Sequence, residues 1–205
     1  IKARTLEGNQ WSALSEATFI TNIPASPENL VISEIFYNPA GQDEDTEFIE
    51  LMNTSNVTIS LAGVSFTGGI SYRFADELTL EAGGRLLLVS DIEAFENTFG
   101  TGLPVAGTYG GQLDNGGERL TLSAADSTEM LSLRYNDRAP WPIRPDNEGT
   151  SLTLVAPETN PDASVPENWR SSLQSGGTPG TSDALPFTGE TASELLTYTL
   201  PDPIA

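Results

Sequence analysis

The sequence predicts an all-β fold, an antiparallel sandwich or barrel with one short helix. Many short runs rich in Val, Ile, Leu, Thr and aromatic residues are each bounded by Gly, Pro, Asn or Asp, which is the pattern of strands joined by turns. Helical patterns do not alternate with these runs, so a parallel α/β sheet is disfavoured. The 205 residues include no cysteine, and a chain of this length can form a sizeable core without disulfides.

Ten strands are predicted, and most follow one another after short turns. They are residues 30–37, 47–53, 57–60, 63–68, 70–74, 77–80, 85–90, 118–124, 129–135 and 150–155.

The single predicted helix covers residues 90–100, SDIEAFENTFG. Ser90 and Glu93 have the spacing of a capping box, and Gly100 suits a left-handed C-terminal cap. Ile92, Phe95 and Phe99 fall on one helical face, and we expect this face to pack against one end of the sandwich rather than to line a ligand pocket.

Composition shifts along the chain suggest four parts. Residues 1–22 read as the terminal hairpin of a preceding β-sandwich module, and residues 23–29 read as a linker containing two prolines. Residues 30–183 form the main sandwich, and residues 184–205 read as a linker or the start of a next module. The chain begins within a strand pattern, so we expect it to be part of a longer protein.

The charge balance excludes several partners. There are nine basic and 29 acidic residues, a net charge of −20, and the only lysine is Lys2. Nucleic acid and anionic membrane surfaces require cationic groups, so neither is expected as a partner. No apolar run approaches the roughly 18 residues that span a bilayer, so membrane insertion is not expected either. The absence of histidine removes the commonest general base and transition-metal ligand and argues against catalysis.

An ordered series of motifs resembles the lamin-tail domain in its bacterial extracellular form. The series begins with LVISEIFYNP (30–39), FIELMN (48–53) and LAGVSFTGG (61–69), and continues with LTLEAGGRLLLVSD (78–91) and DNGGERLTLSAADS (114–127). The segments APWPIRPDNEGTSLTLVAP (139–157) and NWRSSLQSGGTPGTSD (168–183) resemble the extension that closes such domains. Asn147 stands where that extension usually has a glycine. Residues 2–19 resemble the closing strands of immunoglobulin-like modules that precede lamin-tail domains.

The resemblance implies an immunoglobulin-like antiparallel β-sandwich without catalytic activity. It further implies an interaction, adhesion or tethering module of a larger secreted or cell-surface bacterial protein, with a protein or polysaccharide as its partner. The alternative is a carbohydrate-binding module of a multidomain extracellular enzyme. A third reading, a degradative enzyme, would have to rely on carboxylates alone.

The acidic stretch DEDTEFIEL (43–51) is the candidate metal site. Asp43, Asp45 and Glu47 alternate in a loop that enters a strand, and such a loop can offer Ca²⁺ several oxygen ligands, although the spacing is not that of an EF-hand. The alternative is an acidic loop that keeps a sheet edge soluble. No cofactor is required by this reading, and Ca²⁺ is the only one that the sequence suggests.

Strand alternation puts Glu47 and Glu50 on opposite faces, so they cannot form a local acid pair. Glu50 and Glu34 could instead face each other across neighbouring strands, with Arg73 as a candidate counter-ion, or both could point to solvent. Trp141 and Trp169 are candidates for stacking on sugar rings, and the alternative is that they pack at the open end of the sandwich.

Overall fold

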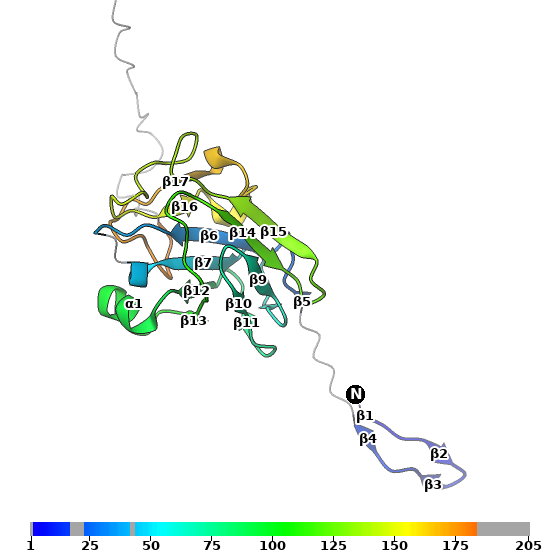
Figure 1. Cartoon of the computed structure of the whole chain (residues 1–205). Helices are drawn as coiled ribbons and strands as arrows, with labels where there is room; N and C mark the ends of the chain where they lie inside the picture. The colour runs from blue at the N-terminus through cyan, green and yellow to red at the C-terminus, as the bar shows by residue number, and fades with distance from the viewer. Residues whose placement is uncertain (1, 17–22, 42–43, 184–205) are drawn as a thin grey trace, which may run out of the picture.

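The computed structural model describes residues 2–16, 23–41 and 44–183, and it shows a β-sandwich with one short α-helix (Figure 1). One layer is a six-stranded sheet in the order β13-β12-β7-β6-β16-β17. Its strands are β13 (Val105–Thr108), β12 (Arg85–Val89), β7 (Phe48–Asn53), β6 (Leu30–Phe36), β16 (Leu152–Leu154) and β17 (Trp169–Ser171).

The second layer contains two smaller sheets. The four-stranded sheet has the order β10-β9-β14-β15, with β10 (Tyr72–Arg73), β9 (Ser65–Gly68), β14 (Arg119–Ser123) and β15 (Glu129–Arg134). The three-stranded sheet has the order β11-β8-β5, with β11 (Thr79–Leu80), β8 (Ile59–Ser60) and β5 (Ile23–Pro24).

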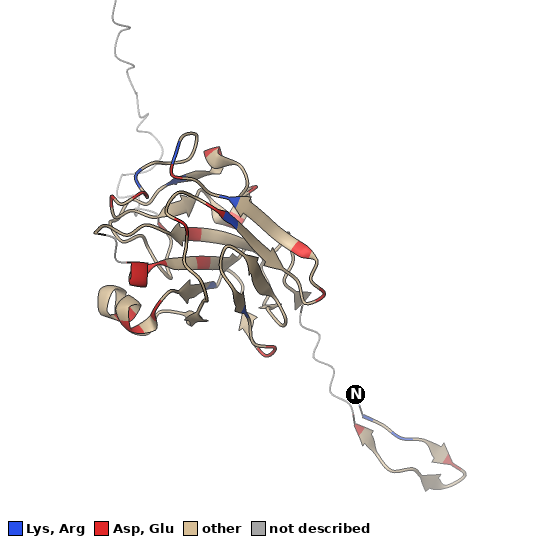
Figure 2. Cartoon of the chain, in the orientation of Figure 1, with Lys and Arg blue, Asp and Glu red and all other residues tan. Residues whose placement is uncertain are grey.

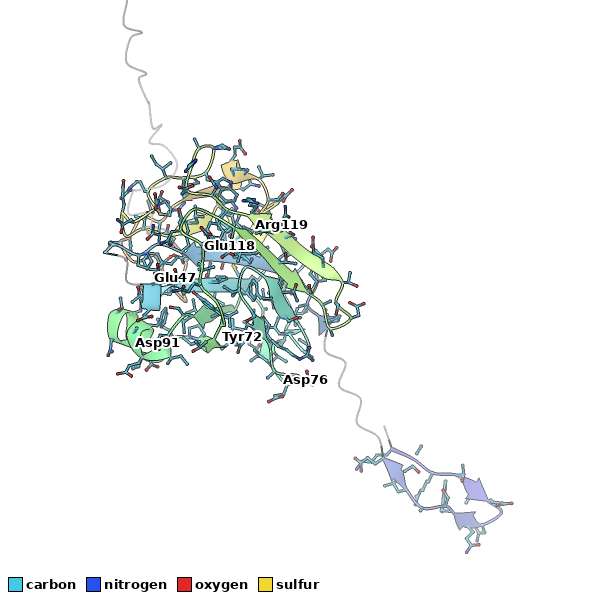
Figure 3. The ribbon with its side chains drawn as sticks, viewed as in Figure 1. Glu47, Tyr72, Asp76, Asp91, Glu118 and Arg119 are labelled. Carbon is cyan, nitrogen blue, oxygen red and sulfur yellow. The ribbon has the colours of Figure 1, made fainter. Side chains whose placement is uncertain are left out.

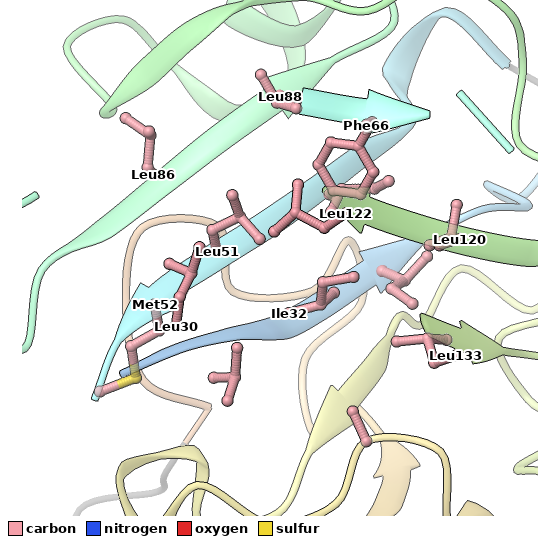
Figure 4. Close-up of a cluster of buried hydrophobic side chains, with 14 of the residues drawn as sticks. Leu30, Ile32, Leu51, Met52, Phe66, Leu86, Leu88, Leu120, Leu122 and Leu133 are labelled. Carbon is pink, nitrogen blue, oxygen red and sulfur yellow. The ribbon is translucent and has the colours of Figure 1, made fainter. Parts of the chain in front are cut away.

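The main hydrophobic core lies between the layers (Figure 4). Ile32 and Leu51 from the six-stranded sheet face Phe66 and Leu122 from the four-stranded sheet, and all four are at most 2% exposed. A second cluster lies on the opposite, outer face of the six-stranded sheet. It is made of Phe36, Phe48, Leu87, Val89 and Phe95, with Phe99, Leu103 and Val105 at its margin. Both faces of the central strands are therefore buried, which explains the nearly continuous burial of β6 and β7.

Helix α1 (Ile92–Phe99) covers one half of the outer face. Phe95 is buried there and Phe99 is half-buried, but Ile92 is 42% exposed, so the predicted apolar face is only partly correct. The capping residue is Asp91 rather than Ser90, because the Asp91 side chain accepts a hydrogen bond from the Ala94 amide (2.8 Å). Three short 3-10 helices complete the unit: η1 (Glu44–Thr46), η2 (Pro157–Thr159) and η3 (Pro166–Asn168).

All ten predicted strands are present, shorter by one to three residues in most cases. Three further strands were missed. β13 and β17 are short, and β5 lies within the stretch that reads as a linker. The antiparallel description needs a correction at two places, because β12 pairs parallel with β13 and β5 pairs parallel with β8. The first follows from α1, which carries the chain back so that β13 runs in the direction of β12.

Residues 2–16 form a hairpin in which β1 (Lys2–Ala3) pairs with β4 (Ser15–Glu16) and β2 (Leu6–Glu7) pairs with β3 (Gln10–Trp11). Every residue of these four strands is exposed. Within the described ranges, no helix is long and apolar enough to cross a membrane.

Candidate functional site

Two glutamates lie opposite each other on the outer face of the six-stranded sheet. Glu34 on β6 and Glu50 on β7 are cross-strand neighbours, as the sequence suggested, but they are 1% and 0% exposed rather than directed to solvent. They share this face with Phe36 and Phe48, which α1 covers. The half that carries the glutamates is covered instead by residues 172–183, which we call the strap.

Three donors surround the Glu34 carboxylate, and two of them come from the strap. The Thr178 amide donates to Oε1 (2.8 Å) and the Thr178 hydroxyl donates to Oε2 (3.2 Å). The third donor is the hydroxyl of Ser151, which immediately precedes β16. Glu34 therefore joins its own strand to two segments that lie more than 110 residues further along the chain.

Glu50 also accepts three hydrogen bonds. Arg85 on β12 forms an ion pair with Oε1, and the Ser33 hydroxyl donates to the same oxygen (2.6 Å). The strap supplies the third donor, the Gly180 amide, to Oε2 (2.7 Å). Ser33 reaches this carboxylate because β6 has a register shift between Ile32 and Glu34, where a bulge re-aims its side chain.

The sequence of the strap, SLQSGGTPGTSD (172–183), suits this position on the sheet. Gly177 has φ of +76°, and a Cβ at this residue would collide with the Glu34 Oε1 atom and lie 2.9 Å from the Ser151 hydroxyl. Glycine adopts this conformation without strain, and because it has no Cβ it lets the backbone approach the buried carboxylate this closely. Gly180 likewise has φ of +79°. The glycines thus allow main-chain amides of the strap to donate hydrogen bonds to the two glutamates.

An ion pair to a buried carboxylate holds the end of the strap. Arg170 on β17 pairs with Asp183, whose side chain is 1% exposed, and also donates to the Asp183 main-chain carbonyl. The Asp183 carboxylate accepts a further hydrogen bond from the Leu173 amide (3.0 Å). Both ends of the strap are therefore fixed by this one carboxylate.

Burial shifts the acidity of both glutamates. It raises the pKa of Glu34 to about 7, against the effect of the Ser151 hydrogen bond, and the nearby Glu50 charge raises it further. Burial also raises the pKa of Glu50, while Arg85 opposes this shift. Two close, buried carboxylates with raised pKa are a pattern often seen in catalytic sites.

The geometry favours a structural role for this pair. A cavity of about 200 Å³ lies beside it, lined by residues that include Glu34, Arg85, Arg170 and Thr178. Yet each carboxylate already accepts three hydrogen bonds from the protein and has almost no exposed surface. A general acid or base must reach the atom to which it transfers a proton, and these groups instead hold the strap.

Glu47 points to the other side of the sheet, as strand alternation predicted. Its side chain is fully buried, and Oε2 accepts hydrogen bonds from the Tyr109 hydroxyl (2.9 Å) and the Leu113 amide (3.1 Å). Oε1 is also buried and has no hydrogen-bond partner among the described residues. Burial raises the pKa of Glu47 to about 7, against the effect of its hydrogen bonds.

This placement bears on the expected calcium site. Asp45 is exposed, Glu47 is buried against Tyr109, and Asp43 lies outside the described residues. In the part of the chain that the structure describes, no three acidic side chains come together as a group that could hold a metal ion. Calcium binding by Asp43, Asp45 and Glu47 stays a prediction.

The two candidate tryptophans are part of the main core. Trp141 and Trp169 are 7% and 4% exposed, with ring centroids 6.0 Å apart, and Trp169 Nε1 donates to the Ala163 carbonyl. The two rings therefore pack in the protein interior, which was the alternative to stacking on sugar rings. Ligand binding by Trp141 and Trp169 stays a prediction.

Sequence reasoning identified the two facing glutamates but not their partners. The expected counter-ion, Arg73, instead pairs with Asp76 at 3.4 Å, and Arg85 takes its place beside Glu50. The strap lies in the segment that resembles the closing extension of lamin-tail domains, and nothing in its sequence indicates contact with the glutamates. Its hydrogen bonds to β6 and β7 span more than 120 residues, and neither strand periodicity nor spacing reports such contacts.

Comparison with known proteins agrees with this architecture. The family model described as Lamin Tail Domain matches residues 23–137, from β5 to just beyond β15. The match ends before β16, β17 and the strap. A search of curated proteins found no match to the chain.

Proposed function

Because this chain belongs to the lamin tail domain family, whose members are non-catalytic immunoglobulin-like domains, we propose that it is a non-catalytic interaction module. In this role it tethers or spaces parts of a larger secreted or cell-surface bacterial protein. Its partner would be a protein or a polysaccharide at the cell surface. The observation that supports tethering is the clamp formed by Glu34 and Glu50 on the strap.

A tether has to hold its entry and exit points when the chain is pulled. At the entry, β5 pairs with β8 and the Ala25 amide donates to the Ser60 carbonyl (2.9 Å). At the exit, the strap is held by main-chain amides on two buried carboxylates and by the Arg170–Asp183 ion pair. Hydrogen bonds to charged groups are about twice as strong as neutral ones, and breaking them here would leave buried charges without partners.

The same clamp supports the absence of catalysis. The facing carboxylates of Glu34 and Glu50 are occupied by the chain's own donors, and the sequence has no histidine or cysteine to supply another base or nucleophile. The buried acids thus have a structural explanation that needs no reaction.

Single-molecule pulling between the two ends of the unit tests this proposal. The chain has no cysteine, so handles can be attached at Ile23→Cys and Ser182→Cys, two exposed positions. We expect one cooperative rupture whose contour-length gain, at about 3.5 Å per residue, corresponds to the whole segment between the handles. Glu34→Gln should add an earlier event in which the strap detaches, whereas Glu158→Gln, an exposed change beside the same cavity, should not. Detachment of the strap at low force in the unmodified chain would contradict a tethering role.

A further inference from the structure

Strand β15 forms an open edge of the four-stranded sheet (Figure 1). It pairs with β14 on one side, and within the described residues no other main-chain segment hydrogen-bonds to residues 129–134. Met130 and Leu131 pack against the core yet remain half-buried. An edge with unpaired main-chain groups and partly exposed apolar side chains is a template for pairing with another strand.

Two arginines on this sheet lack acidic partners. Arg119 on β14 and Arg134 on β15 are directly opposite each other, and both are exposed. Arg119 donates to the Ser132 hydroxyl (2.8 Å), but neither arginine forms an ion pair with any described residue. Like charges at opposite positions destabilise a sheet, and this chain has 29 acidic residues from which a partner could have come. Figure 3 shows Arg119 at the start of β14, next to Glu118.

Strand β15 carries an acid at one end and a base at the other, as Figure 2 shows in red and blue. Leu122 pairs with Leu131 and Ser123 pairs with Glu129, so Met130 is an extra, bulged residue. Because of this bulge, Glu129, Ser132 and Arg134 all lie on the outer face of the sheet, while Leu131 and Leu133 face inward.

We propose that two copies of this chain pair edge to edge through β15 in an antiparallel, two-fold symmetric dimer. Centring the two-fold axis at Ser132 puts Leu131 of each copy opposite Leu133 of the other. Because the bulge takes Met130 out of the pairing, Glu129 of each copy then lies opposite Arg134 of the other, on the side of Arg134 away from Arg119. The isologous contact thus supplies the acid that Arg134 lacks, which offsets its repulsion with Arg119, and it adds cover to the half-buried Leu131.

Charges and a bulge can also protect an edge strand from pairing. Charges of either sign at any position would be enough to protect an edge strand from pairing. Here the charges are of opposite sign, and their positions on either side of Ser132 are related by the two-fold axis. The same charges that would repel an unrelated strand therefore attract a second copy.

Contact through one six-residue strand is small, so the dimer is weak and depends on concentration. Each copy carries a net charge of −20, and the two copies repel each other at low ionic strength. At about 0.15 M salt the Debye length is about 8 Å, which screens the overall repulsion more than the contact between adjacent side chains.

Sedimentation equilibrium of the full chain over micromolar to millimolar concentrations tests the proposal. The unmodified chain should show a monomer–dimer equilibrium at about 0.15 M salt. Glu129→Arg and Arg134→Glu should each weaken dimerisation by at least tenfold, and the double variant Glu129→Arg/Arg134→Glu should restore it. All of these positions are exposed, so circular dichroism should show an unchanged fold.

Net charge alone predicts a different result. Glu129→Arg makes the chain less acidic and would then strengthen association, whereas Arg134→Glu would weaken it. Arg138→Glu, an exposed change outside β15, is the matched charge control and should leave dimerisation nearly unchanged. A chain that stays monomeric at millimolar concentration, or a double variant that fails to dimerise, would overturn the proposal.

Discussion

Glu34 and Glu50 show how two acids can occupy adjacent positions inside a sheet. Like charges at opposite positions are unfavourable, and burial adds a large cost for each charge. The structure offsets these costs with six hydrogen bonds, including the ion pair with Arg85. Removing one donor therefore leaves a buried carboxylate with fewer partners, and it also loosens the strap where the donor is Thr178 or Gly180.

The raised pKa values predict that stability falls as pH rises. The pKa of Glu34 and that of Glu47 are each raised from 4.5 to about 7. Between these values the folded chain retains protons that the unfolded chain has lost, so the unfolding free energy decreases through this window, by on the order of 3 kcal/mol for each group. Urea unfolding measured from pH 4 to pH 8 checks this.

The net charge of −20 could produce a slope of the same sign, because repulsion grows as carboxylates ionise. Measurements in 1 M salt, where the Debye length is about 3 Å, suppress that contribution. Glu34→Gln and Glu47→Gln should each reduce the remaining slope, and Glu158→Gln should not. A slope that is the same in all three variants would show that neither buried glutamate causes it.

Gly177 is the residue at which the strap is most sensitive to substitution. Gly177→Ala adds a Cβ that collides with Glu34 and also strains a backbone with φ of +76°. Gly102 has a similar φ of +86° with open space around it, so Gly102→Ala measures the backbone strain alone, about 1 kcal/mol. We expect Gly177→Ala to lower the unfolding free energy by at least about 2 kcal/mol more than Gly102→Ala does. Equal losses would mean that the strap yields without breaking its contacts to Glu34.

At the scale of elements, two neighbouring polar residues at the start of α1 have different roles. Asp91 caps the helix, whereas the Ser90 hydroxyl donates to the Glu44 carbonyl (2.8 Å) and so joins β12 to η1. Asp91→Ala should lower the unfolding free energy by about 1 kcal/mol. Asp91→Asn should lower it much less, because an asparagine side chain can also cap the helix. Thermal melting compares the two variants. A loss with Ser90→Ala but not with Asp91→Ala would instead favour the capping box that the sequence suggests.

The elements also show what the sequence could predict. All ten predicted strands were found, because alternation or a continuous apolar run marks a strand wherever at least one face is buried. Asn147, which replaces a glycine of the family pattern, has φ of +60° and accepts a hydrogen bond from the Gly41 amide, so the turn is kept.

The missed strands and the clamp depend on contacts distant in sequence. β13, with the sequence VAGT, and β17, with WRS, have weak patterns and are strands because β12 and β16 pair with them. The burial of Glu34, Glu50 and Glu47 was not predicted, because acidic residues in a strand normally mark its solvent face. Their donors lie on other elements, and strand periodicity carries no information about those.

At the scale of the molecule, the family match and the folded unit differ in extent. The match ends at residue 137, but β16 pairs with β6 beyond it, and β17 and the strap complete the same sheet and its outer face. Without these segments, β6 would become an edge strand and Glu34 would lose all three of its donors.

Two shortened chains separate these contributions. A chain ending at residue 172 keeps β16 and β17 but loses the donors from Thr178 and Gly180, so we expect it to fold with a melting temperature lower by several degrees. A chain ending at residue 137 also exposes the edge of β6, and we expect it to show no cooperative melting by calorimetry. If that chain melted like the full one, β16, β17 and the strap would be additions to a finished sandwich. If both shortened chains failed to fold, the strap would be as necessary as the strands, because losing only the strap donors to the two buried glutamates would then cost more than the remaining structure stabilises.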